Sequence, residues 1–142
     1  MVDFPSEKGP MCGWSRVEAV PGARTTLAEL SRSSRCALAT NAADSTEAQI
    51  RKALDRAGLS PYIEKIFCRQ NTGFKKPSPR FFQTLCAGLK TDPGQVILVG
   101  DSLENDVLGA LDFGFDAVWY NRDRKTVPKG IKSITRLSQL LD

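Results

Sequence analysis

Residues 96–106 read VILVGDSLEND, an apolar run that ends in a glycine and continues into three acids. Such an uninterrupted apolar run is typical of a strand buried on both faces of a parallel sheet. Gly100 permits a tight turn at the end of that strand, and Asp101 or Ser102 is placed to cap a following helix. Two interpretations of the acids are open. In the first, the acids lie in the first turn of a helix, where the helix dipole stabilises negative charge. In the second, Asp101 and Asp106 converge beside a hard cation such as Mg²⁺.

The rest of the chain repeats this strand-then-helix pattern. We expect further strands at 36–40, 65–68 and 116–120, and helices at 23–33, 44–57, 79–89, 103–113 and 134–141. Asp44 or Ser45 is the expected cap of the second helix. Alternation about every 25 to 30 residues indicates right-handed βαβ crossovers, and hence a parallel sheet with helices on both faces. Residues 1–20 show no period, so we expect an irregular N-terminal segment ahead of one core domain over 21–142.

Composition and charge exclude several classes of function. The 142 residues carry a net charge of +4, but the basic residues are scattered, so nucleic acid is not an expected partner. No segment approaches the ~20 apolar residues of a membrane helix, and the first ten residues lack a signal-peptide core. The four cysteines form no CxxC pair, which favours buried thiols in the cytoplasm. The chain has no histidine, which excludes Ser-His-Asp catalysis and imidazole bases.

Two further polar pairs fall near predicted strand ends, where ligands bind in sheets of this kind. Thr40-Asn41 closes the strand at 36–40; it is either a turn with a helix cap or a place for a phosphate oxygen. Lys75-Lys76 precedes Pro77, which biases Lys76 toward an extended backbone. These lysines are either solvated charge or the neutralising partner of a phosphate. No GxGxxG follows any strand, so a dinucleotide site is not expected.

The order of these groups closely resembles the haloacid dehalogenase-like (HAD-like) hydrolase superfamily. The second motif of that family is a Ser or Thr that ends a strand, here Thr40 of LATN, and its third is a lysine, here Lys76 of KKPSPRFF. Its fourth motif is an acidic pair, here Asp101 and Asp106 of VGDSLENDVLGA. The flanking stretches VPGARTTLAEL and LDFGFDAVWYNR are similar as well, so the resemblance spans roughly residues 19–122.

The resemblance implies a three-layer Rossmann-like core and Mg²⁺-dependent phosphoryl transfer, usually phosphatase activity on a phosphorylated small molecule. The family's reaction passes through an aspartyl-phosphate, with a second Asp two residues further on as acid and base. By resemblance, Thr40 and Asn41 bind the phosphoryl group and Lys76 balances its charge. Asp101 then holds Mg²⁺, and Asp106 supports the ion directly or through water.

The first family motif, an apolar strand followed by Asp-x-Asp, is missing. Asp3 has only two residues ahead of it, Pro5 stands where the second acid would be, and no Asp-x-Asp occurs later. The chain also has no room for the helical cap that many members carry. We therefore expect a truncated or degenerate HAD-like domain, weakly active or inactive alone, or a non-catalytic phosphate-binding, metal-binding or assembly module derived from the same fold.

The missing motif also removes a strand from the expected sheet. In the family that strand lies between those corresponding to 36–40 and 96–100. Without it, these two strands must pair, or another segment must occupy the position. The candidates are residues 14–20, an N-terminal stretch of a second copy, or a partner chain. An unfilled position would expose backbone groups and apolar faces and so favour association.

Overall fold

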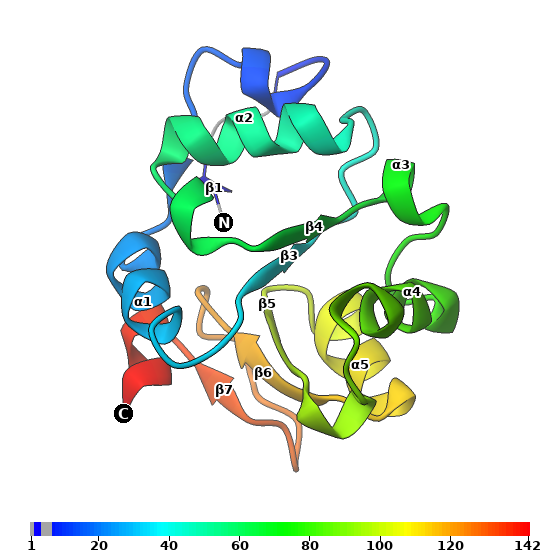
Figure 1. The fold of residues 1–142 in the computed structure, drawn as a ribbon. Helices are drawn as coiled ribbons and strands as arrows, with labels where there is room; N and C mark the ends of the chain where they lie inside the picture. Colours follow the sequence, from blue (N-terminus) through cyan, green and yellow to red (C-terminus); the bar gives the residue numbers. More distant parts are fainter. Residues whose placement is uncertain (1, 4–6) are drawn as a thin grey trace.

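Strands and helices alternate along the chain over residues 37–120 in the order that the sequence predicts, and short strands that it did not predict lie nearer both ends (Figure 1). The computed structural model describes residues 2–3, without their side chains, and residues 7–142. The strands are β1 (Val2–Asp3), β2 (Glu18–Ala19), β3 (Ala37–Ala39), β4 (Lys65–Phe67), β5 (Ile97–Gly100), β6 (Asp116–Tyr120) and β7 (Ser133–Ile134). The α-helices are α1 (Ala23–Leu30), α2 (Glu47–Ala57), α3 (Arg69–Thr72), α4 (Pro79–Leu89) and α5 (Gly109–Phe113). Short 3-10 helices are η1 (Met11–Gly13), η2 (Ser60–Tyr62), η3 (Pro93–Gln95) and η5 (Leu137–Leu141), and η4 (Leu103–Leu108) is a π-helix.

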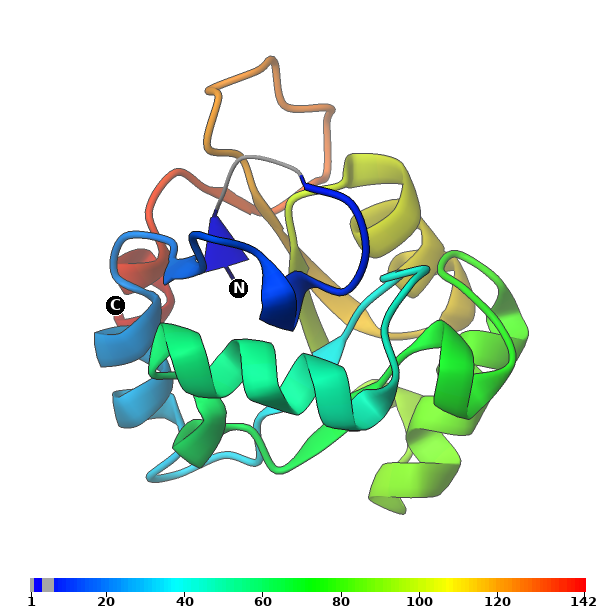
Figure 2. The same cartoon turned by 90° about the horizontal axis from the view of Figure 1, so that it is seen from above.

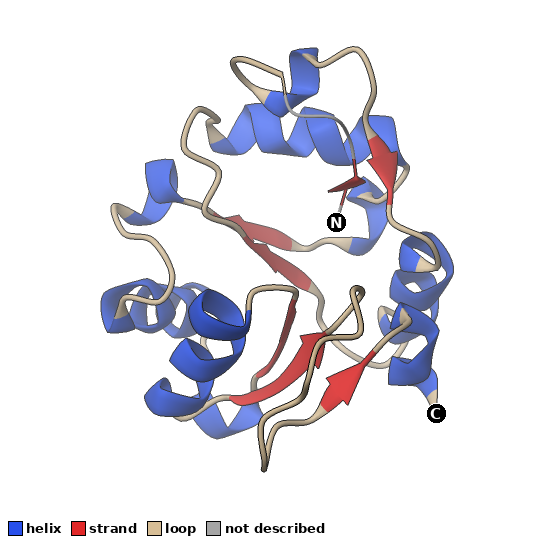
Figure 3. Cartoon of the chain, turned by 180° about the vertical axis from the view of Figure 1, so that it is seen from behind, coloured by secondary structure: helices blue, strands red, loops and turns tan. Residues whose placement is uncertain are grey.

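The core strands form two separate parallel sheets. β3 pairs with β4, and β5 pairs with β6, which pairs in turn with β7. β3 and β5 occupy neighbouring positions in Figures 1 and 3, yet no ladder joins them among the described residues. β2 pairs antiparallel with β1 and with neither β3 nor β5, so residues 14–20 do not fill the position between them. The sheet is therefore divided where the missing strand was expected.

Successive strand residues reach two cores on opposite faces. In β4, Ile66 lies in a core shared with α1 and α2, whereas Phe67 lies in a core shared with α4 and α5. In β6, Tyr120 joins the first core and Trp119 the second. This alternation is what a sheet covered by helices on both faces produces. The three-layer α/β architecture is thus confirmed, and no cap domain is present in the part of the chain that the structure describes.

Helix α2 begins with a cap that the sequence analysis missed. The Thr46 hydroxyl accepts the N–H of Gln49 at 3.2 Å, and the Gln49 side chain accepts the N–H of Thr46 at 2.9 Å. This reciprocal arrangement satisfies two N–H groups of the first turn. The prediction that Asp44 or Ser45 caps this helix is therefore wrong. Gly58, at φ 75°, ends the helix in the left-handed conformation.

Two other helices differ from the sequence prediction. The stretch 103–113 is not one regular helix: it begins as the π-helix η4 and becomes α-helical in α5. The expected terminal helix over 134–141 is instead the strand β7 followed by η5. Ile134 pairs with Tyr120 at the edge of the second sheet, so the first residue of that stretch belongs to a strand. Tertiary pairing overrides the local helical pattern here.

The N-terminal segment covers one side of α2. The Arg56 guanidinium donates to the carbonyls of Cys12, Trp14 and Ser15. The Glu7 carboxylate accepts from the Ser15 hydroxyl at 2.7 Å. These contacts fix the loop before β2 against the helix.

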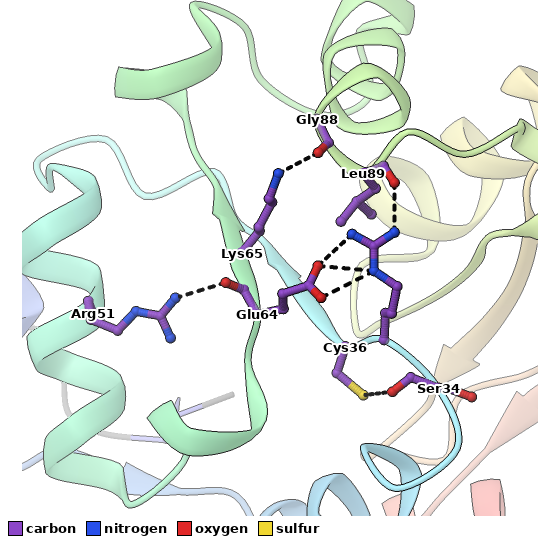
Figure 4. Close-up of polar contacts among 8 residues, drawn as sticks. Ser34, Cys36, Arg51, Glu64, Lys65, Gly88 and Leu89 are labelled. Carbon is purple, nitrogen blue, oxygen red and sulfur yellow. Dashed lines mark hydrogen bonds and ion pairs between the residues drawn. The ribbon is translucent and has the colours of Figure 1, made fainter.

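Polar contacts tie the first sheet to α4 on the second sheet's side of the molecule (Figure 4). Arg35 pairs with Glu64 at 2.6 Å and donates to the carbonyl of Leu89 at 2.7 Å. Lys65 donates to the carbonyl of Gly88 at 2.6 Å. Because these carbonyls end α4, the two cations satisfy groups that lack an intrahelical partner. The contacts thus tie the first sheet to the end of α4 at the amino ends of β3 and β4.

Candidate active site

Lys76 and Asp106 meet at the carboxyl ends of β3 and β5. Lys76 Nζ lies 2.5 Å from Asp106 Oδ1 and donates a second hydrogen bond to the carbonyl of Ala39 at 2.8 Å. The Lys76 and Asp106 side chains are only 10% and 6% exposed. Charges buried this deeply are stable only when paired and hydrogen-bonded. One ammonium group therefore joins the two sheets at their carboxyl ends.

The turn after β5 places the Asp106 carboxylate. Asp106 Oδ2 accepts the N–H of Ser102 at 3.1 Å, and the Ser102 hydroxyl accepts the N–H of Asn105 at 3.1 Å. Ser102, rather than Asp101, is thus the helix cap. Gly100 is required because a Cβ there would overlap the Asp106 carboxylate. Both oxygens of Asp106 therefore have protein partners.

Of the two acids predicted to hold the metal, Asp101 is exposed and Asp106 is buried. Its carbonyl accepts the Trp119 indole N–H at 3.1 Å, and the residue lines a hollow of about 520 Å³. Mg²⁺ takes one or two carboxylates and keeps several waters, so an exposed Asp101 fits a direct ligand and Asp106 fits a support through water. No group of three or more His, Cys, Asp or Glu suited to a metal occurs among the described residues. The metal role of Asp101 and Asp106 stays a prediction.

Thr40 and Asn41 have different partners. The Thr40 N–H donates to the carbonyl of Phe67 at 2.9 Å, and its hydroxyl accepts the N–H of Ala42 at 3.2 Å. The Asn41 amide holds Lys76 on both sides, donating to its carbonyl at 2.9 Å and accepting its N–H at 2.8 Å. Asn41 therefore positions the lysine backbone, and Thr40 lies directly after β3, the strand that Asn41 also follows.

The sequence analysis missed two contributors to this edge. Asn121 is buried directly after β6, and its amide closes a loop to Lys125. Trp119 anchors the backbone of Asp101. A polar residue that directly follows an apolar strand was the available signal, in the stretch DAVWYN. Lys75, the neighbour of Lys76, is exposed.

A parallel sheet between two helical layers, with these groups at its carboxyl edge, defines a Rossmann-like α/β core. The family model of the haloacid dehalogenase-like hydrolases matches residues 3–114, and the chain belongs to that family. Part of this match falls on residues 4–6, which lie outside the described residues.

Several known proteins are similar to the chain. The pyrimidine 5'-nucleotidase YjjG of Escherichia coli is 30% identical in an alignment of 129 positions that covers 86% of this chain and 56% of the relative. The ribulose-1,5-bisphosphate 5-phosphatase of Halopiger xanaduensis is 34% identical over 103 residues, 72% of this chain and 42% of the relative. A solved structure of the putative HAD-hydrolase YfnB from Bacillus subtilis, bound to magnesium, superposes with a TM-score of 0.76 at 27% identity, covering 85% of this chain and 54% of that one. The chain thus spans about half the length of the relatives it matches.

Proposed function

We propose that this chain is the core of a Mg²⁺-dependent phosphohydrolase that lacks its nucleophile and has little or no phosphatase activity alone. In this proposal the Thr40 hydroxyl binds a phosphoryl oxygen, Lys76 balances its charge, and Asp101 holds the metal with Asp106 behind it. When bound, Mg²⁺ neutralises phosphate oxygens and orients the ester. Lys76 keeps a positive charge beside the phosphoryl position, and Asn41 holds the lysine there.

The buried Lys76–Asp106 pair is the observation that carries the proposal. A buried ion pair is a weak source of stability, because apolar residues of similar volume often do as well or better. This pair lies at the carboxyl edge of the sheet, next to the exposed Asp101 and the strand end at Thr40. Ligands bind at that edge in open parallel sheets. A requirement for charge at the site accounts for the pair better than a requirement for stability does.

The expected inactivity follows from the absence of a nucleophile. No Asp-x-Asp occurs anywhere in the sequence, and the described residues do not include the side chain of Asp3. Without a carboxylate that attacks phosphorus, the remaining groups bind and orient a phosphate ester but form no covalent intermediate. Several relatives have names that describe phosphatases, which supports a phosphorylated small molecule as the ligand.

Calorimetric titration tests this proposal. We expect Mg²⁺ to bind the wild-type chain, inorganic phosphate to bind more tightly when Mg²⁺ is present, and Asp101→Asn to abolish the Mg²⁺ effect. Asp112→Asn removes an exposed acid from α5 and is the matched control, which should leave both titrations unchanged. If Asp101→Asn and Asp112→Asn behave alike, Asp101 is not the metal ligand.

A second candidate function is a non-catalytic module that binds phosphate or a metal, or that serves assembly. The observation that favours it is the retention of Thr40, Lys76 and Asp101 in a sequence without the attacking acid. Tight phosphate binding without any turnover, in the presence of every partner chain, would favour this module. Turnover that appears once a partner chain is added would favour the incomplete hydrolase.

The open position between β3 and β5 supports association with a further strand. The Cys36 carbonyl and the Thr40 N–H bond to β4, so the peptide groups of Ala37 and Ala39 point away from β4 toward the gap. Ile97 of β5 is 63% exposed, unusual for a strand in the middle of a core. In our proposal a second copy or a partner chain supplies the strand that covers these edges.

Light scattering tests the second-copy form of this proposal. We expect the mass to rise with concentration and Ile97→Lys to hold the protein as a monomer. Val127→Lys changes another exposed apolar residue, outside the gap, and should have no effect. A concentration-independent monomeric mass would exclude a second copy of this chain as the source of the strand.

We also infer that the protein works in the cytoplasm. The four cysteines have free thiols, which supports a reducing compartment. No described helix combines the length and the apolar character that a bilayer crossing needs.

A further inference from the structure

A hollow of about 520 Å³ opens beside Asp101, beyond the carboxyl ends of β5 and β6. Asp101 and Ser102 line one side of it, and Trp119, Asn121, Arg122 and Lys125 line the other. We call it the β6-end hollow. Its volume is comparable to that of small-molecule sites, and it is open to solvent rather than enclosed. The site proposed above uses only its Asp101 side.

The loop that forms the far side of the β6-end hollow is held in place. The Asn121 side chain is only 4% exposed, and both of its polar atoms bond Lys125. Its oxygen accepts the Lys125 N–H at 2.9 Å, and its amide donates to the Lys125 carbonyl at 2.8 Å. The indole of Trp119 ties the same strand to the carbonyl of Asp101. Lys125 is therefore fixed at its backbone relative to Asp101, although it lies in a loop that projects from the molecule (Figure 2).

This loop brings positive charge to the β6-end hollow. The Lys125 ammonium has no hydrogen bond or ion pair within the described part of the chain. The Arg122 guanidinium lies over the Tyr120 ring, 5.9 Å from its centroid, which adds a second cation on the same side. Asp123 and Asp101 also line the hollow, so its lining carries two positive and two negative side chains before a metal binds. With a divalent ion on Asp101, the hollow would attract anions.

We propose that the β6-end hollow binds a second anionic group of the substrate, and this inference rests on the proposed function. The substrate class is then a sugar-sized phosphate monoester that also carries a carboxylate or a second phosphate. The phosphoryl group lies at Lys76 and Thr40, and the second anion reaches Lys125 with Arg122 beside it. An ammonium group on a backbone that a buried amide holds in place favours such a ligand over a neutral one.

Two ligands of similar size test the inference. Glucose 6-phosphate and 6-phosphogluconate each carry one phosphate, but only the second carries a carboxylate. Their affinities are measured by calorimetry in excess Mg²⁺ on the wild-type chain, Lys125→Gln, Lys125→Glu and Lys129→Gln. Lys129 lies in the same exposed loop but does not line the hollow, so its variant is the matched control for lost charge.

The wild-type chain should bind 6-phosphogluconate about five-fold more tightly than glucose 6-phosphate. This ratio of affinities corresponds to the free energy of one exposed ion pair. Lys125→Gln should remove this preference and leave glucose 6-phosphate binding unchanged. Lys125→Glu should reverse the preference, and Lys129→Gln should keep it.

Three results would overturn the inference. Equal affinities in the wild-type chain, or equal effects of Lys125→Gln and Lys129→Gln, exclude the second-anion site while leaving the proposed function intact. If neither ligand binds in the presence of Mg²⁺, the proposed function fails together with the inference.

Discussion

Lys76 Nζ and Asp106 Oδ1 lie 2.5 Å apart, on segments separated by thirty positions in the chain. The lysine also bonds the carbonyl at the end of β3, and the carboxylate also bonds the backbone that follows β5. In the absence of a ladder between β3 and β5, this contact is a direct polar link between the two sheets at the candidate site. It therefore places two buried charges at the candidate site, and each of them depends on the other to remain buried.

Removal of the lysine should destabilise the protein strongly. Lys76→Met leaves the Asp106 carboxylate buried without its counter-charge, so we expect a loss of about 3 to 5 kcal/mol in the free energy of unfolding. The double variant Lys76→Met with Asp106→Asn removes the orphaned charge and should recover more than half of that loss. Urea denaturation of both variants measures the effect. A loss below about 1 kcal/mol for the single variant would show that the pair is solvated in solution.

Gly100 should tolerate no side chain. A Cβ at this position would overlap the Asp106 carboxylate, which cannot move without breaking its bonds to Lys76 and Ser102. We expect Gly100→Ala to cost at least about 2 kcal/mol of stability and to weaken Mg²⁺ binding. Gly94→Ala is the control, because a Cβ there meets no atom within 4 Å. Equal thermal stability of the two variants would contradict this packing.

Thr26 offers a stabilising substitution. The residue lies in α1 and is only 2% exposed, and its hydroxyl has no hydrogen-bond partner among the residues that the structure describes. Thr26→Val keeps the shape and removes the unsatisfied group, so we expect a gain of about 1 kcal/mol in the free energy of unfolding. Thr25→Val, which removes an exposed hydroxyl bonded to the carbonyl of Gly22, should stay within about 0.5 kcal/mol of the wild type. A loss of stability in Thr26→Val would mean that the hydroxyl has a partner in solution.

The loss of folding stability at acid pH should depend on Glu64. The hydrogen bond from the Arg35 guanidinium lowers the pKa of the Glu64 carboxyl below its ordinary value of 4.5. A depressed pKa contributes stability that is present above the unfolded-state value and is lost as the pH falls through the folded-state value. The difference in stability between wild type and Glu64→Gln should therefore be constant near neutral pH and shrink below about pH 4.5. Thermal unfolding across pH 3 to 7 checks this, with Glu47→Gln in α2 as the control. A difference that does not change with pH would contradict the role of this ion pair.

The sequence predicted the features that follow from local pattern. The apolar run at 96–100 and the glycine after it indicated a strand with acids at its carboxyl end, and the structure has β5 there with Asp101 and Asp106 after it. Three adjacent residues at 44–46 had similar capping tendencies, so pattern alone could not choose Thr46. Only the reciprocal bond with Gln49 distinguishes it.

Other features depend on contacts between distant segments. Asn41 was assigned to phosphate because of its place at a strand end, but its amide is occupied by the backbone of Lys76, 35 residues away. The different environments of Asp101 and Asp106 also depend on Lys76, whose position only the fold determines. The stretch 134–141 has helical spacing, yet Ile134 pairs with β6 because that sheet edge was available.

We propose that this chain has the phosphate-binding and metal-binding residues of a phosphohydrolase site but not its nucleophile. A Mg²⁺-dependent assay with p-nitrophenyl phosphate on the purified chain tests it most directly, with Asp101→Ala run in parallel. We predict a rate for the wild-type chain that does not differ from that of Asp101→Ala or of buffer. Turnover by the wild-type chain that Asp101→Ala abolishes would show a complete active site and contradict the account.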